Sequence, residues 1–473
     1  MVFSESAYGS LLEEIFQRFP SVQKTDFASA YKPGLDGMAA FCAALGHPER
    51  AFRSIHVAGT NGKGSVASLL TAALAATGLR VGLYTSPHLV DFRERSRIVS
   101  GREGLPGAFA RKGSRSDAEG SPSRSETFSV IPKEYVFDFL TKWKPYFMEH
   151  GLSFFEITTG LAFKWFADEG VDAAVIETGL GGRLDSTNVI TPELSIVTTI
   201  GLDHCAQLGN TLAAIAGEKA GIFKPGVPAL VGESNPETDP VFDETAWMVC
   251  PLTYADKVRP SLWYRHQDIL RRMDLQADVQ AKNLRTVLAA VDILKEIPGF
   301  KGLADSEAVM DGIARAGRMT GFRGRWERLS EHPFVIADIG HNPQALKYSF
   351  DQLRRYVEEG RCSSLIIVYG VMADKDLDGI LPLMPADATW FFTAPQTSRA
   401  LPAADILRRY AAFAESRSAG APVRAFATET VRQAVQMALQ LAQSISGRPD
   451  SAPPLVFIGG SAFVVAEALP LFG

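Results

Sequence analysis

Cysteine is scarce in this sequence. The chain of 473 residues has four cysteines, Cys42, Cys205, Cys250 and Cys362, which lie far apart and form no C-x-x-C pair. A disulfide scaffold would need a denser set of cysteines. The pattern therefore favours a soluble protein in a reducing, cytoplasmic setting.

A long apolar run and an excess of charge of one sign are also missing. No uninterrupted apolar run approaches the roughly 18 residues that cross a bilayer, and the opening stretch MVFSESAYGS does not resemble a secretory signal. The 48 basic and 53 acidic residues give a formal net charge of −5. This balance argues against nucleic acid or a membrane as a partner recognised through bulk charge, and is compatible with small anionic ligands.

The length of the chain indicates two domains. One hydrophobic core rarely serves 473 residues, and a composition with 46% hydrophobic and 21% charged residues is ordinary for globular proteins. We place the first domain at residues 1–320 and the second at residues 325–473. Within the first domain, the segment 101–127 is rich in Gly, Ser and charged residues, a composition that predicts a mobile surface insertion. A lid over the substrate is the functional alternative.

Short apolar segments alternate with helix-like segments, which predicts an α/β fold. Residues 54–58 predict a strand, residues 65–76 a helix and residues 81–84 another strand, and together they make a βαβ unit. The other predicted strands lie at residues 173–176, 194–200, 333–337, 365–369, 389–393 and 455–458. Open α/β sheets bind ligands at the carboxyl ends of their strands, so functional residues are expected there.

A glycine-rich turn follows the first predicted strand. The stretch Ile55 to Val66, IHVAGTNGKGSV, is similar to the phosphate-binding loop G-x-x-x-x-G-K-[ST], whose backbone N–H groups and lysine hold phosphates. Lys63 stands at a helix start, where the positive helix end also favours phosphate. Gly64, however, occupies the position of the hydroxyl that holds Mg²⁺ in that pattern. The alternative is a tight structural turn.

The missing hydroxyl has a candidate after the next strand. Ser86, in the segment YTSPHL, is expected at the same edge of the sheet; the alternative is that Thr85 and Ser86 cap a helix before Pro87. Magnesium prefers oxygen ligands, and Glu177 follows another predicted strand and opens the segment ETGLGGRLD. A glutamate that adjoins a buried strand needs a counter-charge or a metal; otherwise it is a surface acid beside a turn.

Two further segments bring polar side chains to this edge. Asp203 and His204 end the segment TTIGLDH after another predicted strand, although an isolated histidine is more often structural than a ligand. Lys219, in the segment IAGEKAGIFKP, lies on a half-apolar helix face. It is either a surface lysine that extends its ammonium into water or a buried lysine of lowered pKa. In the second case, a carbamylated Lys219 would be an oxygen ligand for a metal.

These segments together resemble the folylpolyglutamate synthase and dihydrofolate synthase family of Mur-type ATP-dependent ligases. The matching phrases follow the family's order from about residue 31, where YKPGLD resembles the entry to the folate pocket. The others are HVAGTNGKGS, TSPHL with Glu94-Arg95, ETGLGGRLDSTN, GLDH followed by LGNT, AGEKAGIFKPG, GRWE, DIGHNP, GVMADKD and GGSAFVVAE. The segment 101–127 is outside the family pattern, and DIG at residues 338–340 replaces the more usual DGA.

The resemblance implies a fold and a set of roles. The fold is a P-loop-type ATP-binding domain with a mostly parallel sheet, followed by a smaller Rossmann-like C-terminal α/β domain. ATP and two Mg²⁺ ions are the implied cofactors, and Lys63, Lys219 and His341 are the implied catalytic residues. The implied contacts are Gly59, Thr60, Asn61, Gly62, Lys63, Gly64, Asn283, Arg325 and Asp338 for ATP, Ser86, Glu177, His204 and Lys219 for the metals, and Arg95 and Asp185 for a pterin substrate.

The family's activity implies the reaction. ATP would phosphorylate a carboxylate of dihydropteroate or of a folate, and the amino group of L-glutamate would attack the acyl phosphate. Closure of the two domains about a hinge near Gly321 and Gly324 would exclude water, and the enzyme is expected to be a monomer. The alternatives are a Mur-type ligase for a peptidoglycan precursor and a P-loop kinase or NTPase without ligation.

Overall fold

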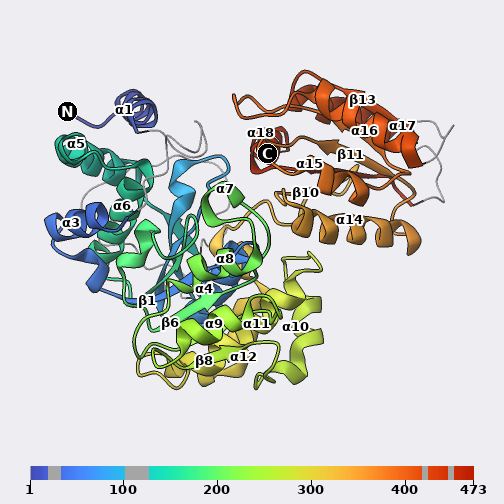
Figure 1. Ribbon diagram of the computed structural model, residues 1–473. Coiled ribbons are helices and arrows are strands. Elements are labelled where there is room, and N and C mark those ends of the chain that lie inside the picture. Colours follow the sequence, from blue (N-terminus) through green and yellow to red (C-terminus); the bar gives the residue numbers. More distant parts are fainter. Residues whose placement is uncertain (1, 20–33, 102–126, 418–423, 446–451, 473) are drawn as a thin grey trace, which may run out of the picture. The chain divides into compact units, whose positions relative to one another are not determined.

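The computed structural model describes residues 2–19, 34–101, 127–417, 424–445 and 452–472 (Figure 1). These residues form two compact units, one from Met1–Asp274 and Gln280–Phe322, the other from Leu275–Val279 and Arg323–Gly473. The predicted insertion at 101–127, except Gly101 and Thr127, and the first three residues of YKPGLD lie outside the described residues. In the described part of the chain, no helix combines the length and the apolar character that a membrane span requires.

An eight-stranded sheet forms the centre of the first unit, in the order β4-β3-β2-β5-β1-β6-β7-β8. Strands β2 and β5 to β8 run parallel to β1, and β3 and β4 pair in antiparallel fashion at one edge. The bounds are β1 Arg53–Ala58, β2 Arg80–Tyr84, β3 Ser96–Ser100, β4 Phe128–Val130, β5 Ala173–Glu177, β6 Leu194–Val197, β7 Ala229–Val231 and β8 Leu252–Tyr254. Because β5 lies between β1 and β2, the loops that follow these three strands meet at one edge.

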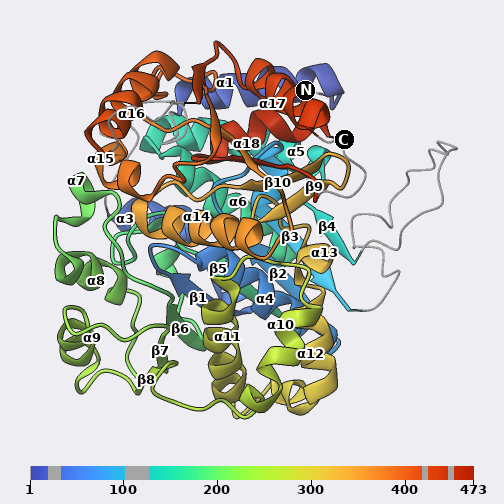
Figure 2. The same ribbon diagram turned by 90° about the vertical axis from the view of Figure 1, so that its right-hand side faces the viewer.

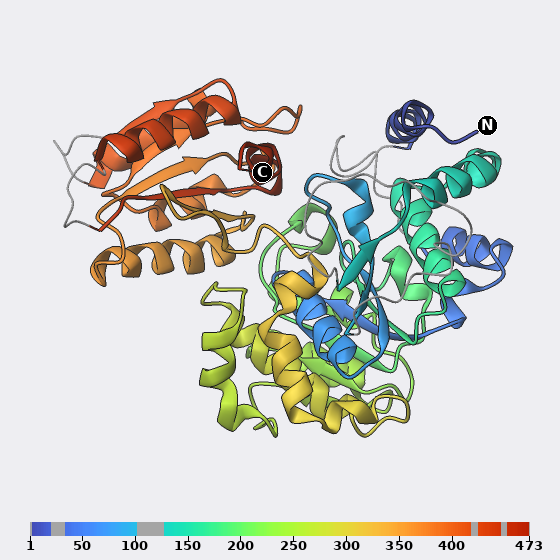
Figure 3. The same ribbon diagram turned by 180° about the vertical axis from the view of Figure 1, so that it is seen from behind.

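Helices cover both faces of this sheet. Figures 1 and 3 both show α5 and α6 on one side of it and α11 and α12, next to α4, on the other. Helix α4 is apolar all round because it lies between the sheet and α11 to α13. The bounds are α1 Glu5–Arg18, α3 Asp36–Ala44, α4 Lys63–Ala76, α5 Lys133–His150, α6 Phe154–Asp168, α7 Cys205–Leu208, α8 Leu212–Ala220, α9 Asp239–Ala246, α10 His266–Arg272, α11 Gln280–Leu294, α12 Ser306–Ala314 and α13 Ala316–Thr320.

The second unit has a six-stranded sheet in the order β13-β12-β11-β14-β10-β9, parallel except for β9. Helices α14 and α16 pack on one face and α17 and α18 on the other, and Figure 2 shows α14 and α17 on opposite sides of β10. The bounds are β9 Glu327–Ser330, β10 Phe334–Asp338, β11 Leu365–Tyr369, β12 Thr389–Phe392, β13 Ala425–Ala427, β14 Leu455–Gly459, α14 Pro343–Glu358, α15 Leu377–Ile380, α16 Ala403–Arg417, α17 Val431–Ile445 and α18 Ala462–Ala468.

The α/β fold predicted from the sequence, with a mostly parallel sheet in each part, is confirmed. Most predicted elements differ from the observed bounds by at most one residue at either end, and two differ by more. The helix predicted from residue 65 begins at Lys63. The strand predicted over 194–200 ends at Val197, because the hydroxyls of Thr198 and Thr199 donate to the carbonyl of Asn61 at 2.7 and 3.2 Å and hold this segment against the loop after β1.

Gly312 tests the packing that supports α4. A β-carbon at this position of α12 would lie 2.5 Å from the backbone oxygen of Ala72 in α4. Gly312→Ala should therefore lower the free energy of unfolding by about 1–3 kcal/mol, despite the better helix propensity of alanine. Urea unfolding monitored by circular dichroism measures this change.

The matched control is another helical glycine. At Gly217 in α8, an added β-carbon would meet its nearest neighbour, Val241, at 3.8 Å, an ordinary contact. Gly217→Ala should leave stability unchanged or raise it by up to about 1 kcal/mol. Equal effects of the two substitutions would contradict the packing argument.

Candidate active site

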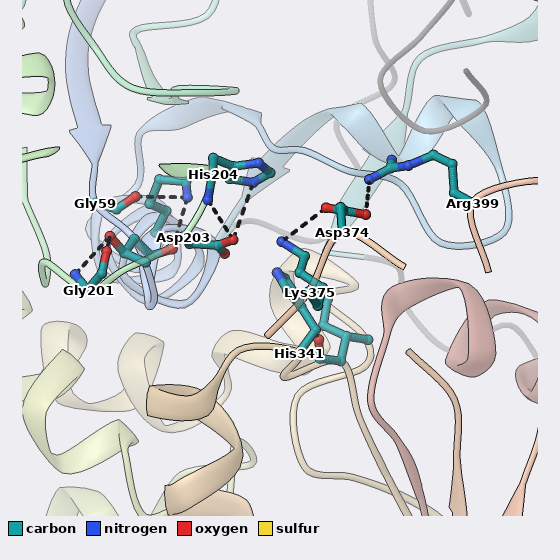
Figure 4. A network of polar contacts seen from close by, with 11 residues as sticks. Gly59, Gly201, Asp203, His204, His341, Asp374, Lys375 and Arg399 are labelled. Atoms are coloured by element: carbon teal, nitrogen blue, oxygen red, sulfur yellow. Dashed lines mark hydrogen bonds and ion pairs between the residues drawn. The ribbon is translucent and has the colours of Figure 1, made fainter. Parts of the chain in front are cut away.

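The glycine-rich loop lies between the end of β1 and the start of α4. Its N-terminal glycine, Gly59, has a φ of +146°, and a β-carbon there would lie 1.9 Å from the hydroxyl of Thr198, so glycine is required. The ammonium of Lys63 turns back over the loop and donates to the carbonyls of Gly59 at 3.0 Å and Thr60 at 3.3 Å. The N–H of Gly201 donates to the Thr60 hydroxyl at 3.0 Å, and Figure 4 shows Gly201 close to Gly59.

The structure explains why a glycine replaces the usual hydroxyl at position 64. A β-carbon there would lie 3.0 Å from the ring of Phe322 and 3.4 Å from Oε2 of Glu177. The same Oε2 accepts a hydrogen bond from the backbone N–H of Ser86 at 3.1 Å. The loop, Ser86 and Glu177, which the sequence analysis placed at one sheet edge, are therefore neighbours.

The helix-cap alternative for Ser86 does not hold. Within the described residues the next helical turn after β2 is a 3-10 turn at Phe92–Arg95, and its cap is Asp91. The surface-acid alternative for Glu177 fails as well, because this residue ends β5 and is only 3% exposed. Its carboxylate faces cationic neighbours. Burial lowers the pKa of Arg97 to about 10, and the negative charges of Glu94 and Glu177 oppose that shift.

Lys219 is buried, which contradicts the surface-lysine alternative. It lies near the end of α8 and is 3% exposed. Burial, together with the positive charge of Lys63, lowers the pKa of Lys219 to about 7, while the negative charge of Asp203 opposes the shift. Such a lysine has a substantial uncharged fraction near neutral pH, which is the form that reacts with carbon dioxide.

His204 follows β6 in a left-handed conformation, with a φ of 53°. Its backbone N–H donates to Oδ1 of Asp203 at 2.9 Å, and its Nε2 lies 3.9 Å from the same oxygen (Figure 4). Asp203 thus links His204 electrostatically to Lys219.

The donor set at this edge suits magnesium only in part. Among the described residues, no group of three or more His, Cys, Asp and Glu side chains is arranged to hold a metal ion. A hydroxyl and a carboxylate, from Ser86 and Glu177, are hard oxygen donors that suit Mg²⁺ when phosphate and water oxygens complete the shell. At His204 and Lys219, an oxygen ligand exists only if the lysine is carbamylated.

The carboxylate of Asp185, a predicted pterin contact, accepts hydrogen bonds from residues of its own loop. Its Oδ2 accepts hydrogen bonds from the backbone N–H groups of Gly179 and Leu180, each at 2.8 Å, and its Oδ1 accepts from the N–H and hydroxyl of Thr187 at 3.0 and 2.5 Å. Burial raises the pKa of Asp185, and these hydrogen bonds oppose the rise. The carboxylate therefore fixes the shape of the segment ETGLGGRLD.

Arg95, the other predicted pterin contact, lies in an aromatic environment. Its Nε donates to Nδ1 of His88 at 2.9 Å, and its guanidinium lies 5.5 Å from the centre of the Phe154 ring. Burial lowers the pKa of Arg95. The adjacent Phe155, which the sequence analysis missed, has its ring where a β-carbon of Gly179 would be, 2.5 Å away. The phrase SFFE before a helix was the available signal.

Asn283, for which the resemblance implies a nucleotide contact, lies against the glycine-rich loop. Its Oδ1 is 2.6 Å from the position of a β-carbon on Gly62. The contact with Gly62 was not predicted, because 221 positions separate the two residues in the sequence. Gln280 and Phe322, which also touch this loop region, were not foreseen.

The second unit carries the remaining predicted residues at the carboxyl end of β10. Asp338 accepts hydrogen bonds from the N–H groups of Trp326 at 2.9 Å and Gly340 at 2.8 Å. Burial raises the pKa of Asp338, and the positive charge of Arg325 opposes the rise. Nδ1 of His341 lies 3.1 Å from the carbonyl of Ile339.

Two cationic side chains, Lys375 and Arg399, follow strands β11 and β12 of the same sheet. Asp374, after β11, pairs with Arg399 at 2.9 Å and with Lys375 at 4.0 Å, and Figure 4 draws these side chains with His341. The positive charges of Lys375 and Arg399 hold the pKa of Asp374 below its ordinary value although burial opposes them. The phrase GVMADKD thus contributes charged side chains to the edge that carries Asp338.

Comparisons with known proteins give the family. Residues 324–447 match the model of the Mur ligase, glutamate ligase domain. The dihydrofolate synthase/folylpolyglutamate synthase of Mycobacterium tuberculosis is 31% identical over 481 residues, 93% of this chain and 90% of that one. A probable bifunctional folylpolyglutamate synthase/dihydropteroate synthase of Haloferax volcanii is 33% identical over 378 residues, 76% of this chain but 40% of that longer protein.

A solved structure has the same fold. The folylpolyglutamate synthase of Mycobacterium tuberculosis complexed with ADP superposes with a TM-score of 0.78 at 29% identity, and the match covers 99% of this chain and 98% of that one. The resemblance inferred from the sequence motifs is therefore confirmed. The chain belongs to the folylpolyglutamate synthase and dihydrofolate synthase family of Mur-type ligases.

Proposed function

We propose that this protein is an ATP-dependent ligase that joins L-glutamate to dihydropteroate, to the γ-carboxylate of a folate, or to both. The observation that carries the proposal is the convergence of Lys63, Glu177 and Lys219 at one edge of the eight-stranded sheet, at the ends of β1 and β5 and on α8. Membership of the family supports the reaction class, and the Mur ligase match over residues 324–447 supports a glutamate-ligating second domain.

Amide formation from a carboxylate needs activation, because oxide is a poor leaving group. Transfer of the γ-phosphoryl group of ATP to a carboxylate oxygen releases ADP and gives an acyl phosphate. The glutamate nitrogen then attacks the acyl carbon, loses a proton, and expels phosphate. Both steps depend on positioning and on stabilising negative charge, so no protein nucleophile is required.

The glycine-rich loop and Lys63 have the features that hold phosphates. The residues Gly59, Thr60, Asn61, Gly62 and Gly64 present backbone at the start of α4, where the helix dipole favours an anion. In the structure, Lys63 donates to two carbonyls of this loop. When ATP enters, the lysine exchanges these bonds for phosphate oxygens without leaving the loop.

Ser86 and Glu177 would hold one Mg²⁺, and His204 with carbamylated Lys219 would hold a second. Bound there, magnesium supplies charge neutralisation to the phosphates. The chain's own contribution is orientation: the N–H of Ser86 fixes the carboxylate of Glu177, and Asp203 fixes the backbone of His204.

Asp185 would act on the pterin through the loop that its carboxylate shapes, beside Arg95 and the ring of Phe155. In the second domain, Arg325 and Asp338 are proposed nucleotide contacts, and His341 is proposed to act at the reacting groups. A hinge near Gly321 and Gly324 would allow the two domains, 1–320 and 325–473, to close. A cytoplasmic monomer that acts on small molecules, and binds no nucleic acid, completes the proposal.

The first test measures ADP release by the purified protein with Mg-ATP, L-glutamate and either dihydropteroate or tetrahydrofolate. Release should require glutamate, and the pterin that supports it distinguishes the two activities. Lys219→Ala should lower the rate by about 100-fold or more, because it removes a metal ligand. With ¹³C-bicarbonate, a carbamate signal should appear in the NMR spectrum of the unmodified protein and be absent in the variant.

Lys224→Met is the matched control, because this lysine of the same segment donates to the Asn188 carbonyl at 3.0 Å and has no proposed ligand. It should lower stability slightly and keep the activity. Release that ignores glutamate and both pterins would point to an NTPase or kinase, and release that requires a peptidoglycan precursor would point to the other Mur-type reaction.

Gly64→Ser tests the proposed use of the loop. The substitution restores the common hydroxyl of phosphate-binding loops, but its β-carbon would meet Phe322 at 3.0 Å and Glu177 at 3.4 Å. We expect the affinity for Mg-ADP, measured by calorimetry, to fall by about tenfold. The second substitution Phe322→Leu should recover part of the loss. Tighter binding by Gly64→Ser alone would show that the hydroxyl position is open.

A further inference from the structure

Gln280 is a buried side chain beside the glycine-rich loop to which the reaction described above gives no role. It is the first residue of α11 and is 1% exposed. Its Nε2 donates to the hydroxyl of Ser65 at 3.3 Å, and its Oε1 accepts a hydrogen bond from Nδ2 of Asn283 at 2.8 Å. The amide of Gln280 thus connects the first turn of α4 to the first turn of α11.

This contact determines how the Asn283 amide is turned. Because Nδ2 is directed to Gln280, Oδ1 is directed away from it, to the side where Gly62 lies. Among the residues that the structure describes, none donates a hydrogen bond to this Oδ1. Asn283 therefore presents a hydrogen-bond acceptor beside the loop.

An acceptor in this place has a restricted set of ligands. Phosphate oxygens are themselves acceptors, so a carbonyl oxygen does not bind them. The donors of an adenine nucleotide are the hydroxyls of the ribose and the exocyclic amine of the base. A wrongly turned amide would offer N–H groups instead and would favour a carbonyl at the same place on the base.

We propose that Gln280 is a positioning residue that holds Asn283 with its carbonyl oxygen toward a donor group of the nucleotide, and thereby sets nucleotide selectivity. The inference rests on the proposed nucleotide binding but not on ligation. Gln280 does not touch the nucleotide itself. It acts by satisfying Nδ2 of Asn283, which would otherwise be a buried donor without a partner.

The experiment measures the affinities of Mg-ADP, Mg-IDP and Mg-2′-deoxyADP by calorimetry, for the unmodified chain and for Gln280→Met. IDP replaces the exocyclic amine by a carbonyl, and 2′-deoxyADP lacks one ribose hydroxyl. The unmodified chain should prefer ADP over one of the two analogues, and that analogue identifies the donor. Gln280→Met, which keeps the size but not the hydrogen bonds, should reduce this preference about fivefold or more.

Two further variants separate positioning from simple destabilisation. Gln280→Glu keeps an acceptor for Nδ2 of Asn283, so it should retain the preference even where the added charge weakens all three nucleotides equally. The double variant Gln280→Met with Asn283→Ala should discriminate no worse than Asn283→Ala alone, because Gln280 acts through Asn283.

The matched control is Gln352 in α14, another buried glutamine. Its Nε2 donates to the carbonyl of Gln276 at 3.0 Å, and its Oε1 accepts from the N–H of Asp278 at 2.8 Å. Gln352→Met should lower the melting temperature and leave the ADP preference unchanged.

Three results would overturn the proposal: equal affinities of the unmodified chain for all three nucleotides, an unchanged preference in folded Gln280→Met, or an equal loss of preference in Gln352→Met. Because these measurements need no turnover, they are independent of the ligase assay. A chain that shows the Gln280-dependent preference but releases no glutamate-dependent ADP would disprove the ligase function alone.

Discussion

The buried carboxylate of Glu177 is the constraint on which the edge of the first unit depends. An ionised carboxylate at the end of a central strand is costly unless hydrogen bonds and opposite charges compensate it. The N–H of Ser86 supplies one bond, and Arg97, itself buried, supplies positive charge nearby. Glycine at position 64 keeps the space beside Oε2 clear. The Phe322 ring, 3.0 Å from the position of a β-carbon on Gly64, and this carboxylate, 3.4 Å from it, together limit the space where the usual phosphate-binding loop has a hydroxyl residue.

Several cationic side chains of the first unit are held at a cost that a polyanion would relieve. Lys63 and Lys219 repel each other enough for the charge of Lys63 to contribute to the lowered pKa of Lys219. Arg95 also has a lowered pKa because it is buried. Cations held against desolvation and mutual repulsion favour a polyanionic ligand, because phosphate charge stabilises their protonated forms. The arrangement therefore favours a nucleotide over a neutral ligand.

The sequence predicted what depends on neighbours along the chain and missed what depends on distant contacts. Residues 365–369 were predicted at their true bounds because a short apolar run between turn-forming residues is typical of a buried strand. Lys219 stayed ambiguous, because an alanine-rich helix face does not reveal what covers it. The contacts of Phe322 with Gly64 and of Gln280 with Ser65 join residues that the chain separates widely, and no local pattern encodes them. Lys63 and Glu177 were found because strand ends gather at one edge in any parallel sheet.

The chain passes between the two units three times, and two of these passages, Val279 to Gln280 and Phe322 to Arg323, adjoin the glycine-rich loop. Gln280 is held on Ser65, while Asp278, two residues earlier, is held in the second unit by Gln352. Phe322 packs at Gly64, and Gly324 is held in the second unit by Glu327 and by the N–H of Ile339. At Gly321, an added β-carbon would lie 2.3 Å from the ring of Phe128.

These contacts hold residues on both sides of the two passages. In each of these two passages a single residue lies between the residues just described: Val279 lies between Asp278 and Gln280, and Arg323 between Phe322 and Gly324. Val279 precedes Gln280 and Arg323 follows Phe322, and both of these side chains contact the glycine-rich loop region. These two connections are therefore short and packed where they adjoin the glycine-rich loop, through the contacts of Gln280 with Ser65 and of Phe322 with Gly64.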